Sequence, residues 1–237
     1  MPSARSRWRL PLLLLLLALA LAVHALHGGR LALPERWNPW APLRIEAEPN
    51  LLTRFKLARL SGDAALCRSV LAQADMRFRP VPDWQAAPGC AMHNAVRVEA
   101  TSAAVGPAFL LSCRTAVSLA LWERHVVQPA AQRHFGQPVV RIDHLGSYVC
   151  RNVYGRPGAP RSQHATADAL DVAGFRLADG QRVQVLKHWE EPGARGRFLQ
   201  EVGEGACRFF DGALGPAYNA AHRNHLHLDR GGPRVCR

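Results

Sequence analysis

The chain has 237 residues, of which 48% are hydrophobic, and it carries a formal net charge of +12. This length is enough for one domain with a hydrophobic core, and the composition excludes an intrinsically disordered chain. The positive excess suits an anionic partner such as cell-wall polymer, lipid headgroups or nucleic acid, although a generally arginine-rich composition would also account for it.

The first 30 residues have the pattern of an export segment. Three arginines precede an unbroken apolar run of twelve residues from Leu12 to Val23. A run of this length is typical of a signal peptide, and extending it over residues 10–26 brings it close to the minimum for a spanning helix. We expect residues 1–30 to be a signal peptide or a single membrane anchor, with the anchor slightly favoured. The rest of the chain would then lie outside the cytoplasm.

The next segment, residues 31–50, is rich in proline and glycine and predicts a linker, so a compact domain is expected over residues 51–237. Six widely spaced cysteines with no CxxC pair predict up to three disulfides in an exported protein rather than a cysteine zinc site. Their pairing stays open, because six cysteines allow fifteen connectivities. They are Cys67, Cys90, Cys113, Cys150, Cys207 and Cys236.

Helical patterns in the domain come mostly before the strands. Helices are predicted over residues 63–74, 112–135 and 190–210, with Asp63 as an N-cap and Pro129 breaking or kinking the second helix. Strands are predicted within residues 76–83, 94–100, 138–152, 167–186 and 224–230, the fourth range being a hairpin that turns at Asp179-Gly180. This order favours an α+β fold with a mainly antiparallel sheet and helices packed on it.

The last predicted strand carries two histidines with the spacing of one strand face. His225 and His227 alternate with Leu226 and Leu228, so the leucines are expected to fill the core while both histidines point to the other face. His222 stands three residues earlier, where the chain enters the strand.

A second polar segment lies about fifty residues upstream, in "RSQHATADALDVAG". His164 and Asp171 are separated by small residues that let two backbones approach closely. Asp171 falls within an apolar strand, where a buried carboxylate requires a cation. Zinc is one such cation and Arg151 is another. Catalytic zinc sites use three His or carboxylate ligands, so the two segments together predict a metal site.

Three motifs also resemble known zinc peptidases. "SQHATADALD" resembles the SxHxxGxAxD motif of the enzymes that cut D-alanyl peptides in bacterial cell walls, among them D-Ala-D-Ala carboxypeptidases and penicillin-insensitive murein endopeptidases. "HRNHLHLD" is similar to the HxxHxH ending of the endopeptidases, and "GSYVCRN" resembles the SGYR strand of the carboxypeptidases. More closely still, the stretch from "RWNPWAPL" to the terminal "CR" resembles the extensin-like family of exported bacterial proteins. The resemblance implies a zinc D-Ala-D-Ala peptidase-like core.

The resemblance also implies roles for individual residues. His164, Asp171 and His227 match the three zinc ligands. His225 matches the histidine near the attacking water, and His222 matches an additional active-site histidine. Arg151 matches the arginine that steadies the carbonyl oxygen or a substrate carboxylate, and Ser162 and Tyr148 match residues on the substrate side. The chain departs from the pattern at Ala167, where glycine is usual, and it lacks the ExxH base, so acid–base work falls to His225 or His222.

From these residues we expect a zinc-dependent peptidoglycan amide hydrolase of endopeptidase or carboxypeptidase type. Its partners would be peptidoglycan or its stem peptides, and the inner membrane through the N-terminal segment. We expect an exported monomer of the periplasm or cell envelope that does not bind nucleic acid. Two alternatives remain, a non-catalytic wall-binding module that retains the fold, and a zinc-free scaffold in which Asp171 pairs with Arg151 or Arg161.

Overall fold

The computed structural model describes residues 9–27 and 33–237, which belong to two compact units, 1–41 and 42–237. In the first unit, helix α2 (Arg9–His27) contains an 18-residue segment of mean hydropathy 2.2, long and apolar enough to cross a membrane by length and composition. A signal sequence passes the same test. Two of the three arginines that precede the apolar run, Arg5 and Arg7, lie outside the described residues.

The second unit begins at Pro42, earlier than the predicted domain start at residue 51. Leu43 and Ile45 are 6% and 3% exposed and belong to the hydrophobic core. The last part of the predicted linker is therefore part of the folded unit, because it contributes apolar side chains to that core.

The three predicted helical ranges, 63–74, 112–135 and 190–210, each contain helix, whereas the helices over 53–59 and 185–188 lie outside them. Asp63 caps helix α4, since its Oδ1 accepts a hydrogen bond from the Leu66 amide at 2.8 Å. The helices are α3 (Thr53–Arg59), α4 (Ala64–Leu71), α5 (Cys113–Trp122), α6 (Gln128–Phe135), α7 (Val185–His188) and α8 (Ala194–Ala206), with short helical turns η1 (Glu123–Val127), η2 (Val153–Gly155), η3 (Gln163–Thr166) and η4 (Ala220–His222).

Within the described residues, nine strands form the main sheet in the order β1-β4-β5-β6-β7-β10-β9-β11, with β8 paired to β7, and β2 and β3 form a separate pair. The strands are β1 (Arg77–Pro80), β2 (Trp84–Ala87), β3 (Cys90–Met92), β4 (Ala95–Ala100), β5 (Ala104–Ser112), β6 (Val139–Gly146), β7 (Ala169–Leu177), β8 (Arg182–Gln184), β9 (Gly212–Leu214), β10 (Leu226–Asp229) and β11 (Val235–Cys236).

The predicted α+β class is confirmed, whereas the prediction of a mainly antiparallel sheet needs correction, because the sheet is mixed. Strands β5 and β6 run parallel, as do β9 and β11. The physical reason for the first pair is the long helical segment from α5 to α6, which crosses from the end of β5 to the start of β6. Parallel neighbours require a crossover of this kind.

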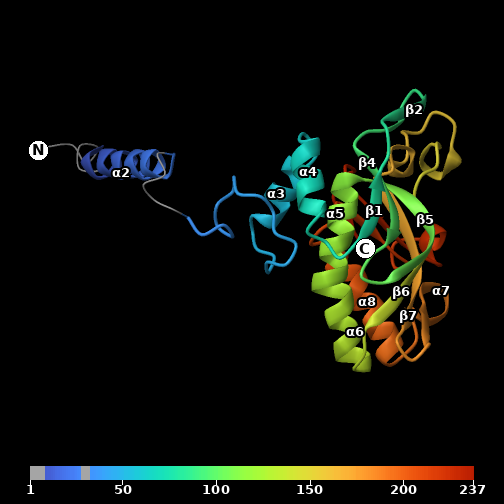
Figure 1. Cartoon of the computed structure of the whole chain (residues 1–237). Coiled ribbons are helices and arrows are strands. Elements are labelled where there is room, and N and C mark those ends of the chain that lie inside the picture. Colours follow the sequence, from blue (N-terminus) through green and yellow to red (C-terminus); the bar gives the residue numbers. More distant parts are fainter. Residues whose placement is uncertain (1–8, 28–32) are drawn as a thin grey trace, which may run out of the picture. The chain divides into compact units, whose positions relative to one another are not determined.

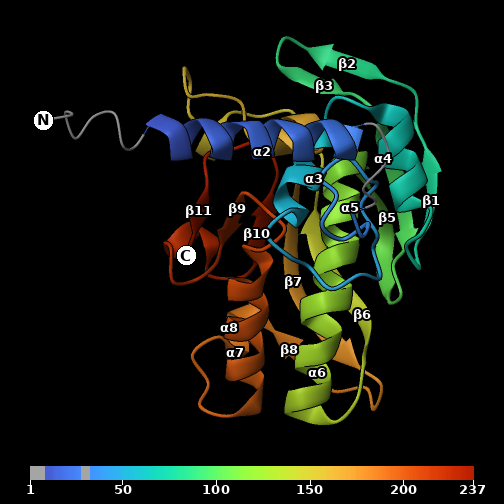
Figure 2. The ribbon, with the colours of Figure 1, turned by 90° about the vertical axis from the view of Figure 1, so that its left-hand side faces the viewer.

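Helices α5, α6 and α8 cover one face of the main sheet, and the described part of this unit places no comparable helical layer on the other face (Figures 1 and 2). The core between them is apolar and includes the fully buried Trp122, whose Nε1 donates to the Val202 carbonyl at 2.8 Å. The open face of the sheet is therefore the side on which polar side chains can gather.

The predicted break at Pro129 takes the form of a local change in helical geometry. The five-residue π-helical turn η1 lies between α5 and α6, and Pro129 occupies the first turn of α6. Proline lacks an amide N–H, which is tolerated in a first turn. The helical segment therefore continues past Pro129 to Phe135.

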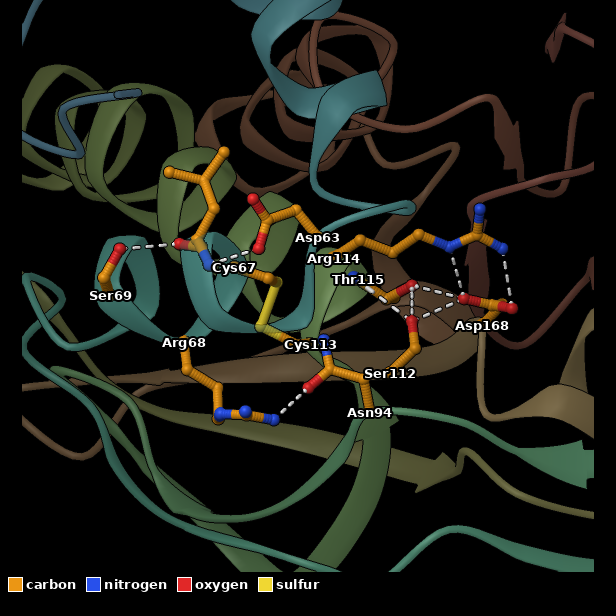
Figure 3. Close-up of a disulfide and its surroundings, with 11 residues drawn as sticks. Asp63, Cys67, Arg68, Ser69, Asn94, Ser112, Cys113, Arg114, Thr115 and Asp168 are labelled. Carbon is orange, nitrogen blue, oxygen red and sulfur yellow. Dashed lines mark hydrogen bonds and ion pairs between the residues drawn. A yellow bond between two sulfur atoms is a disulfide. The ribbon is translucent and has the colours of Figure 1, made fainter. Parts of the chain in front are cut away.

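Three disulfides are present, as predicted. They join Cys67 to Cys113, Cys90 to Cys150 and Cys207 to Cys236, and no described cysteine is free. The first bond ties α4 to the start of α5 in the core (Figure 3). The second ties the β3 strand to the loop that precedes the first polar segment. The third ties the C-terminal strand β11 to the end of α8.

Candidate metal centre

Strands β7 and β10 bring the two polar segments together. They pair antiparallel with His227 opposite Asp171, and with Leu226 opposite Val172. Leu226 and Leu228 are 2% and 0% exposed and face the helical layer, as predicted. Because side chains alternate along a strand, His227 and Asp171 project from the open face of the sheet.

His164 reaches the same point from the turn η3, immediately before β7. The Ser162 hydroxyl caps this turn by accepting from the His164 amide at 3.4 Å. The ring is 3% exposed, and its Nδ1 donates to the Ser147 carbonyl. This hydrogen bond fixes the tautomer and leaves Nε2 free to face Asp171 and His227.

Three donor atoms converge here. Asp171 Oδ1 lies 2.9 Å from His227 Nδ1 and 3.3 Å from His164 Nε2, and the two ring nitrogens are 3.2 Å apart. His225 Nε2 lies 3.5 Å from the same Asp171 oxygen. Among the described residues, His164, Asp171 and His227 form the group whose ligand atoms are close enough to hold one metal ion.

His227 contacts a second carboxylate through its other nitrogen. Its Nε2 donates to Asp229 Oδ2 at 3.1 Å, on the same face of β10. Gly212 on the neighbouring strand leaves room for this carboxylate, because a Cβ there would lie 2.1 Å from Asp229 Oδ2. A carboxylate on the outer nitrogen of a ligand histidine orients the ring and increases its basicity.

His225 and His222 are each oriented by an asparagine. His225 Nδ1 donates to Asn224 Oδ1 at 2.8 Å, and His222 Nδ1 donates to Asn219 Oδ1 at 2.8 Å. The amide oxygen can only accept, so in both rings the proton lies on Nδ1 and the lone pair lies on Nε2. The two rings are 5.3 Å apart between centroids.

The charges of the cluster separate its histidines into two kinds. Burial lowers the pKa of His227, but the hydrogen bonds to Asp171 and Asp229 outweigh it and raise the pKa to about 9. Burial raises the pKa of Asp171, but the hydrogen bonds from His164 and His227 hold it far below its usual range.

His222 and His225 behave oppositely. Burial, helped by the charges of His227 and His225, lowers the pKa of His222 to about 4. Burial also lowers the pKa of His225, although the Asp171 carboxylate opposes it. Both rings are therefore neutral bases at pH 7.

A cavity of about 500 Å³ opens over these residues. Its wall includes the guanidinium-bearing side chain of Arg151 and two half-exposed tyrosines, Tyr154 and Tyr218, that flank His222. The tyrosine hydroxyl of Tyr154 accepts from Asn219 Nδ2 at 2.9 Å, so the same asparagine holds both a wall residue and a histidine.

Of the three residues predicted on the substrate side, two line the cavity and one does not. Arg151 lines the cavity, and Ser162 lines it while capping η3. Tyr148 lies away from the cavity lining, packed on a small apolar cluster and edge-on to Trp84 at 5.7 Å. The zinc-free alternative would pair Asp171 with Arg151 or Arg161. Arg161 instead donates hydrogen bonds to Asn152 Oδ1 and to the Pro88 carbonyl.

The departure at Ala167 has a conformational meaning. Ala167 ends the η3 turn with φ of 56°, in the left-handed region that favours glycine. It is fully buried against Met92 and Ala95. The site thus uses a strained alanine where glycine fits the backbone more easily, and the buried methyl group contacts an apolar cluster.

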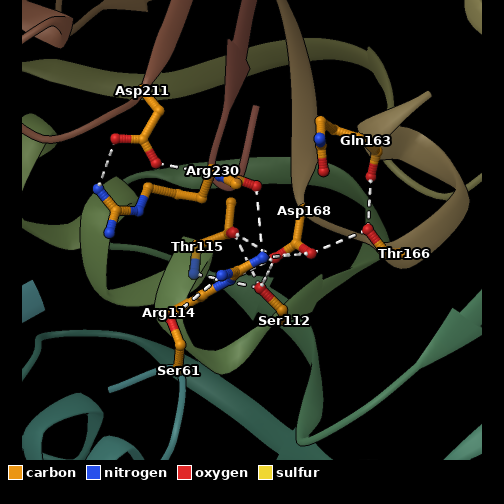
Figure 4. A network of polar contacts seen from close by, with 10 residues as sticks. Ser61, Ser112, Arg114, Thr115, Gln163, Thr166, Asp168, Asp211 and Arg230 are labelled. Atoms are coloured by element: carbon orange, nitrogen blue, oxygen red, sulfur yellow. Dashed lines mark hydrogen bonds and ion pairs between the residues drawn. The ribbon is translucent and has the colours of Figure 1, made fainter. Parts of the chain in front are cut away.

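Between the two predicted ligands, Asp168 holds the turn to the helical layer (Figure 4). Its carboxylate accepts from Arg114 Nε and Nη2 at 2.9 and 2.8 Å, and from Ser112 and Thr166 hydroxyls. The Arg230 amide donates to the Asp168 carbonyl at 2.9 Å. This buried network fixes η3 and the end of β10 against the start of α5.

Sequence reasoning did not identify Asp229, Asn219 or Asn224 as parts of the site. Asp229 carried a usable signal, because it lies two residues after His227 and therefore on the same face of the strand. The asparagines carried none, because their role depends on how the 219–224 turn folds.

The fold and the cluster define an α+β domain that three disulfides cross-link. It carries a histidine–carboxylate centre on the open face of a mixed sheet. A family model described as "Extensin-like protein C-terminus" matches residues 65–237, and the chain belongs to this family. No curated protein and no solved structure matches the chain.

Proposed function

We propose that this protein is a zinc-dependent amide hydrolase that acts on the peptides of peptidoglycan in the cell envelope. The observation that carries the proposal is the donor triangle of His164, Asp171 and His227, with sides of 2.9, 3.2 and 3.3 Å. Tetrahedral zinc with ligands at 2.0–2.1 Å has neighbouring donors about 3.3 Å apart. The donor types also fit, because the set is two imidazoles and one carboxylate.

The surroundings of the donors fit a metal centre as well. Each ligand histidine uses its remaining nitrogen for a hydrogen bond, to the Ser147 carbonyl or to Asp229. Such outer contacts hold the rings in place for a metal. Zinc, when bound, supplies a Lewis acid that polarises a carbonyl and makes water more acidic.

His225 is the side chain best placed to move the proton of the attacking water. Its Nε2 lies 3.5 Å from Asp171 Oδ1, beside the donor triangle, while Asn224 keeps the proton on Nδ1. A neutral imidazole with this tautomer accepts a proton at Nε2 and can return it to the leaving amine. His222, held in the same way by Asn219, is the second candidate for that transfer.

Arg151 would hold the anionic part of the substrate. It lines the cavity, and its side chain has no hydrogen-bond or ion-pair partner within residues 9–27 and 33–237. A free guanidinium binds a carboxylate or a developing oxyanion through paired N–H groups. The aromatic rings of Tyr154 and Tyr218 would contact the remainder of the substrate peptide in the cavity.

The substrate class rests on the resemblance of the motifs to zinc peptidases of the cell wall and on the apolar N-terminal helix. That helix is compatible with export, and we propose that it delivers the domain to the periplasm, anchored to the inner membrane. A reporter fused after Arg237 should then be active only outside the cytoplasm. Activity of the reporter in the cytoplasm would contradict this placement.

The test of hydrolysis compares wild type with His225→Ala on purified peptidoglycan and on soluble stem peptides. The wild type should release new amino termini, and the variant should be slower by about 10²- to 10⁴-fold, the usual contribution of a general acid–base residue. His93→Ala, at an exposed histidine that contacts Asp83 on the surface, is the matched control. A folded, zinc-loaded wild type that binds the wall but releases no product would favour the non-catalytic wall-binding module.

A further inference from the structure

Three arginines form a row across neighbouring strands on the open face of the sheet. Arg141 on β6 lies opposite Arg176 on β7, and Arg176 lies opposite Arg182 on β8. The residues beside them in sequence face the core with exposures of 2% or less. These core residues are Ile142, Phe175 and Val183. We call Arg141, Arg176 and Arg182 the arginine row.

Few acidic side chains neutralise the positive charge of the arginine row. Asp143 pairs with Arg141 Nε at 2.7 Å. Arg176 and Arg182 have no hydrogen-bond or ion-pair partner among the residues that the structure describes, and Arg176 Nε is buried without one. Like charges directly opposite each other on a sheet are destabilising, so the row has a free-energy cost that a bound anion would remove.

The arginine row lies on the same face as the candidate metal centre and along the same strand. The β6–β7 register skips Ala173, since Asp143 pairs with Gly174 and His144 with Val172, so the alternation of β7 shifts by one residue there. Asp171 and Arg176, five positions apart, therefore both project from the open face of β7. At about 3.3 Å per residue they are separated by roughly 16 Å along the strand. A polymer bound at the metal centre and continuing along β7 would therefore reach the row.

We propose that the arginine row binds carboxylates of the peptidoglycan strand beyond the bond held at the metal centre. This inference rests on the proposed function, because that function makes the wall polymer the occupant of the neighbouring cavity. Stem peptides present carboxylates repeatedly along one polymer, and guanidinium groups bind carboxylates in paired hydrogen bonds. The positive excess of the chain is thus concentrated, in part, where a long substrate would lie.

The experiment measures binding of the full chain, in neutral detergent, to lipid-free peptidoglycan by sedimentation at several salt concentrations. All proteins carry His225→Ala so that the wall stays intact. The test variant adds Arg141→Gln, Arg176→Gln and Arg182→Gln. The matched control adds Arg68→Gln, Arg197→Gln and Arg208→Gln, exposed arginines on the helical side of the sheet that remove the same charge. Thermal midpoint and zinc content report folding in both variants.

The test variant should bind at least about tenfold more weakly at low salt and lose most of the salt dependence, because exposed charge pairs are screened by salt. The control should stay within about twofold of the parent. Equal binding by test variant and control would overturn the proposal.

A parallel arm uses lipid vesicles containing phosphatidylglycerol. Row-dependent binding to vesicles, without row-dependent binding to the wall, would overturn the wall assignment and point to a lipid surface. Row-dependent wall binding by a protein whose wild type hydrolyses nothing would support the row while contradicting the hydrolase.

Discussion

His227 and Asp229 lie two residues apart on β10, and their side chains meet on the open face of the sheet, Nε2 to Oδ2, at 3.1 Å. This contact turns the Nδ1 of His227 toward His164 and Asp171. Of the histidines in the cluster, His227 faces the donor triangle with Nδ1, whereas His164 faces it with Nε2. His227 presents Nδ1 to the donor triangle because its Nε2 is already hydrogen-bonded to the Asp229 carboxylate.

Asp229→Ala should weaken zinc binding by about 10- to 100-fold, the usual effect of removing an outer partner of a ligand histidine. Asp229→Asn should lose less, because an amide oxygen can still accept from Nε2. Competition with a chromophoric chelator measures both affinities. Asp75→Asn, at an exposed aspartate, is the matched control and should bind zinc as the wild type does. Unchanged affinity in Asp229→Ala would contradict this role.

Zinc binding should release about one proton per ion at pH 7. With a pKa of about 9, metal-free His227 is protonated at that pH, and a ligand nitrogen must be deprotonated. Affinity should therefore rise about tenfold per pH unit from pH 7 to about 9 and then level off. Because the folded pKa exceeds the unfolded value, His227 stabilises the metal-free fold below about pH 6.5 and loses that contribution as the pH rises through 9.

Calorimetry of zinc binding in two buffers of different ionisation enthalpy counts these protons. A heat that is identical in both buffers would mean that no proton leaves, and would contradict the protonation state assigned to His227.

Asp168→Asn should lower the free energy of unfolding by about 3 kcal/mol, because it leaves the largely buried Arg114 without its carboxylate. The same change should weaken zinc binding, since Asp168 holds the turn that carries His164. Urea unfolding of the metal-free protein measures the first effect. Asp179→Asn, in the exposed turn between β7 and β8, is the control. A loss below about 1 kcal/mol would show that the network contributes little.

The Cys67–Cys113 disulfide lies in the core and closes a loop of 46 residues. The chain-entropy relation gives about 4 kcal/mol for a loop of that length. The double variant Cys67→Ala/Cys113→Ala should therefore unfold at a clearly lower urea concentration. In the native wild type no thiol should react with an alkylating reagent before reduction, and six should react afterwards. Reactive thiols in the unreduced protein would contradict the pairing.

The sequence predicted those parts of the fold in which one periodicity dominates. The alternation of Leu226 and Leu228 with His225 and His227 correctly assigned the faces of β10, because burial of the leucines sets that strand's orientation. Strand β5 was missed, since Gly106 and Pro107 lie inside it and depress strand propensity. Gly106 adopts φ of 72° beneath the Arg141 guanidinium, a contact visible only once β5 and β6 are neighbours.

The same limit applies to the site. The residues alone predicted that the two polar segments meet, and the resemblance to zinc peptidases implied the set of His164, Asp171 and His227, whose ligand atoms lie close together in the structure. The parallel pairing of β5 with β6 depends on where the α5–α6 segment crosses the sheet, which no local pattern encodes. The orientation of His222 and His225 depends on a turn whose asparagines have many possible conformations.

The most direct test of the metal centre is the zinc content of the purified chain and of its single variants, measured by elemental analysis. About one zinc per chain is expected in wild type and in His225→Ala, whose histidine shares the strand face without belonging to the donor triangle. His164→Ala, Asp171→Ala and His227→Ala should each lose the metal while remaining folded by circular dichroism. Full zinc occupancy in those three variants, or a folded wild type without zinc, would contradict the site.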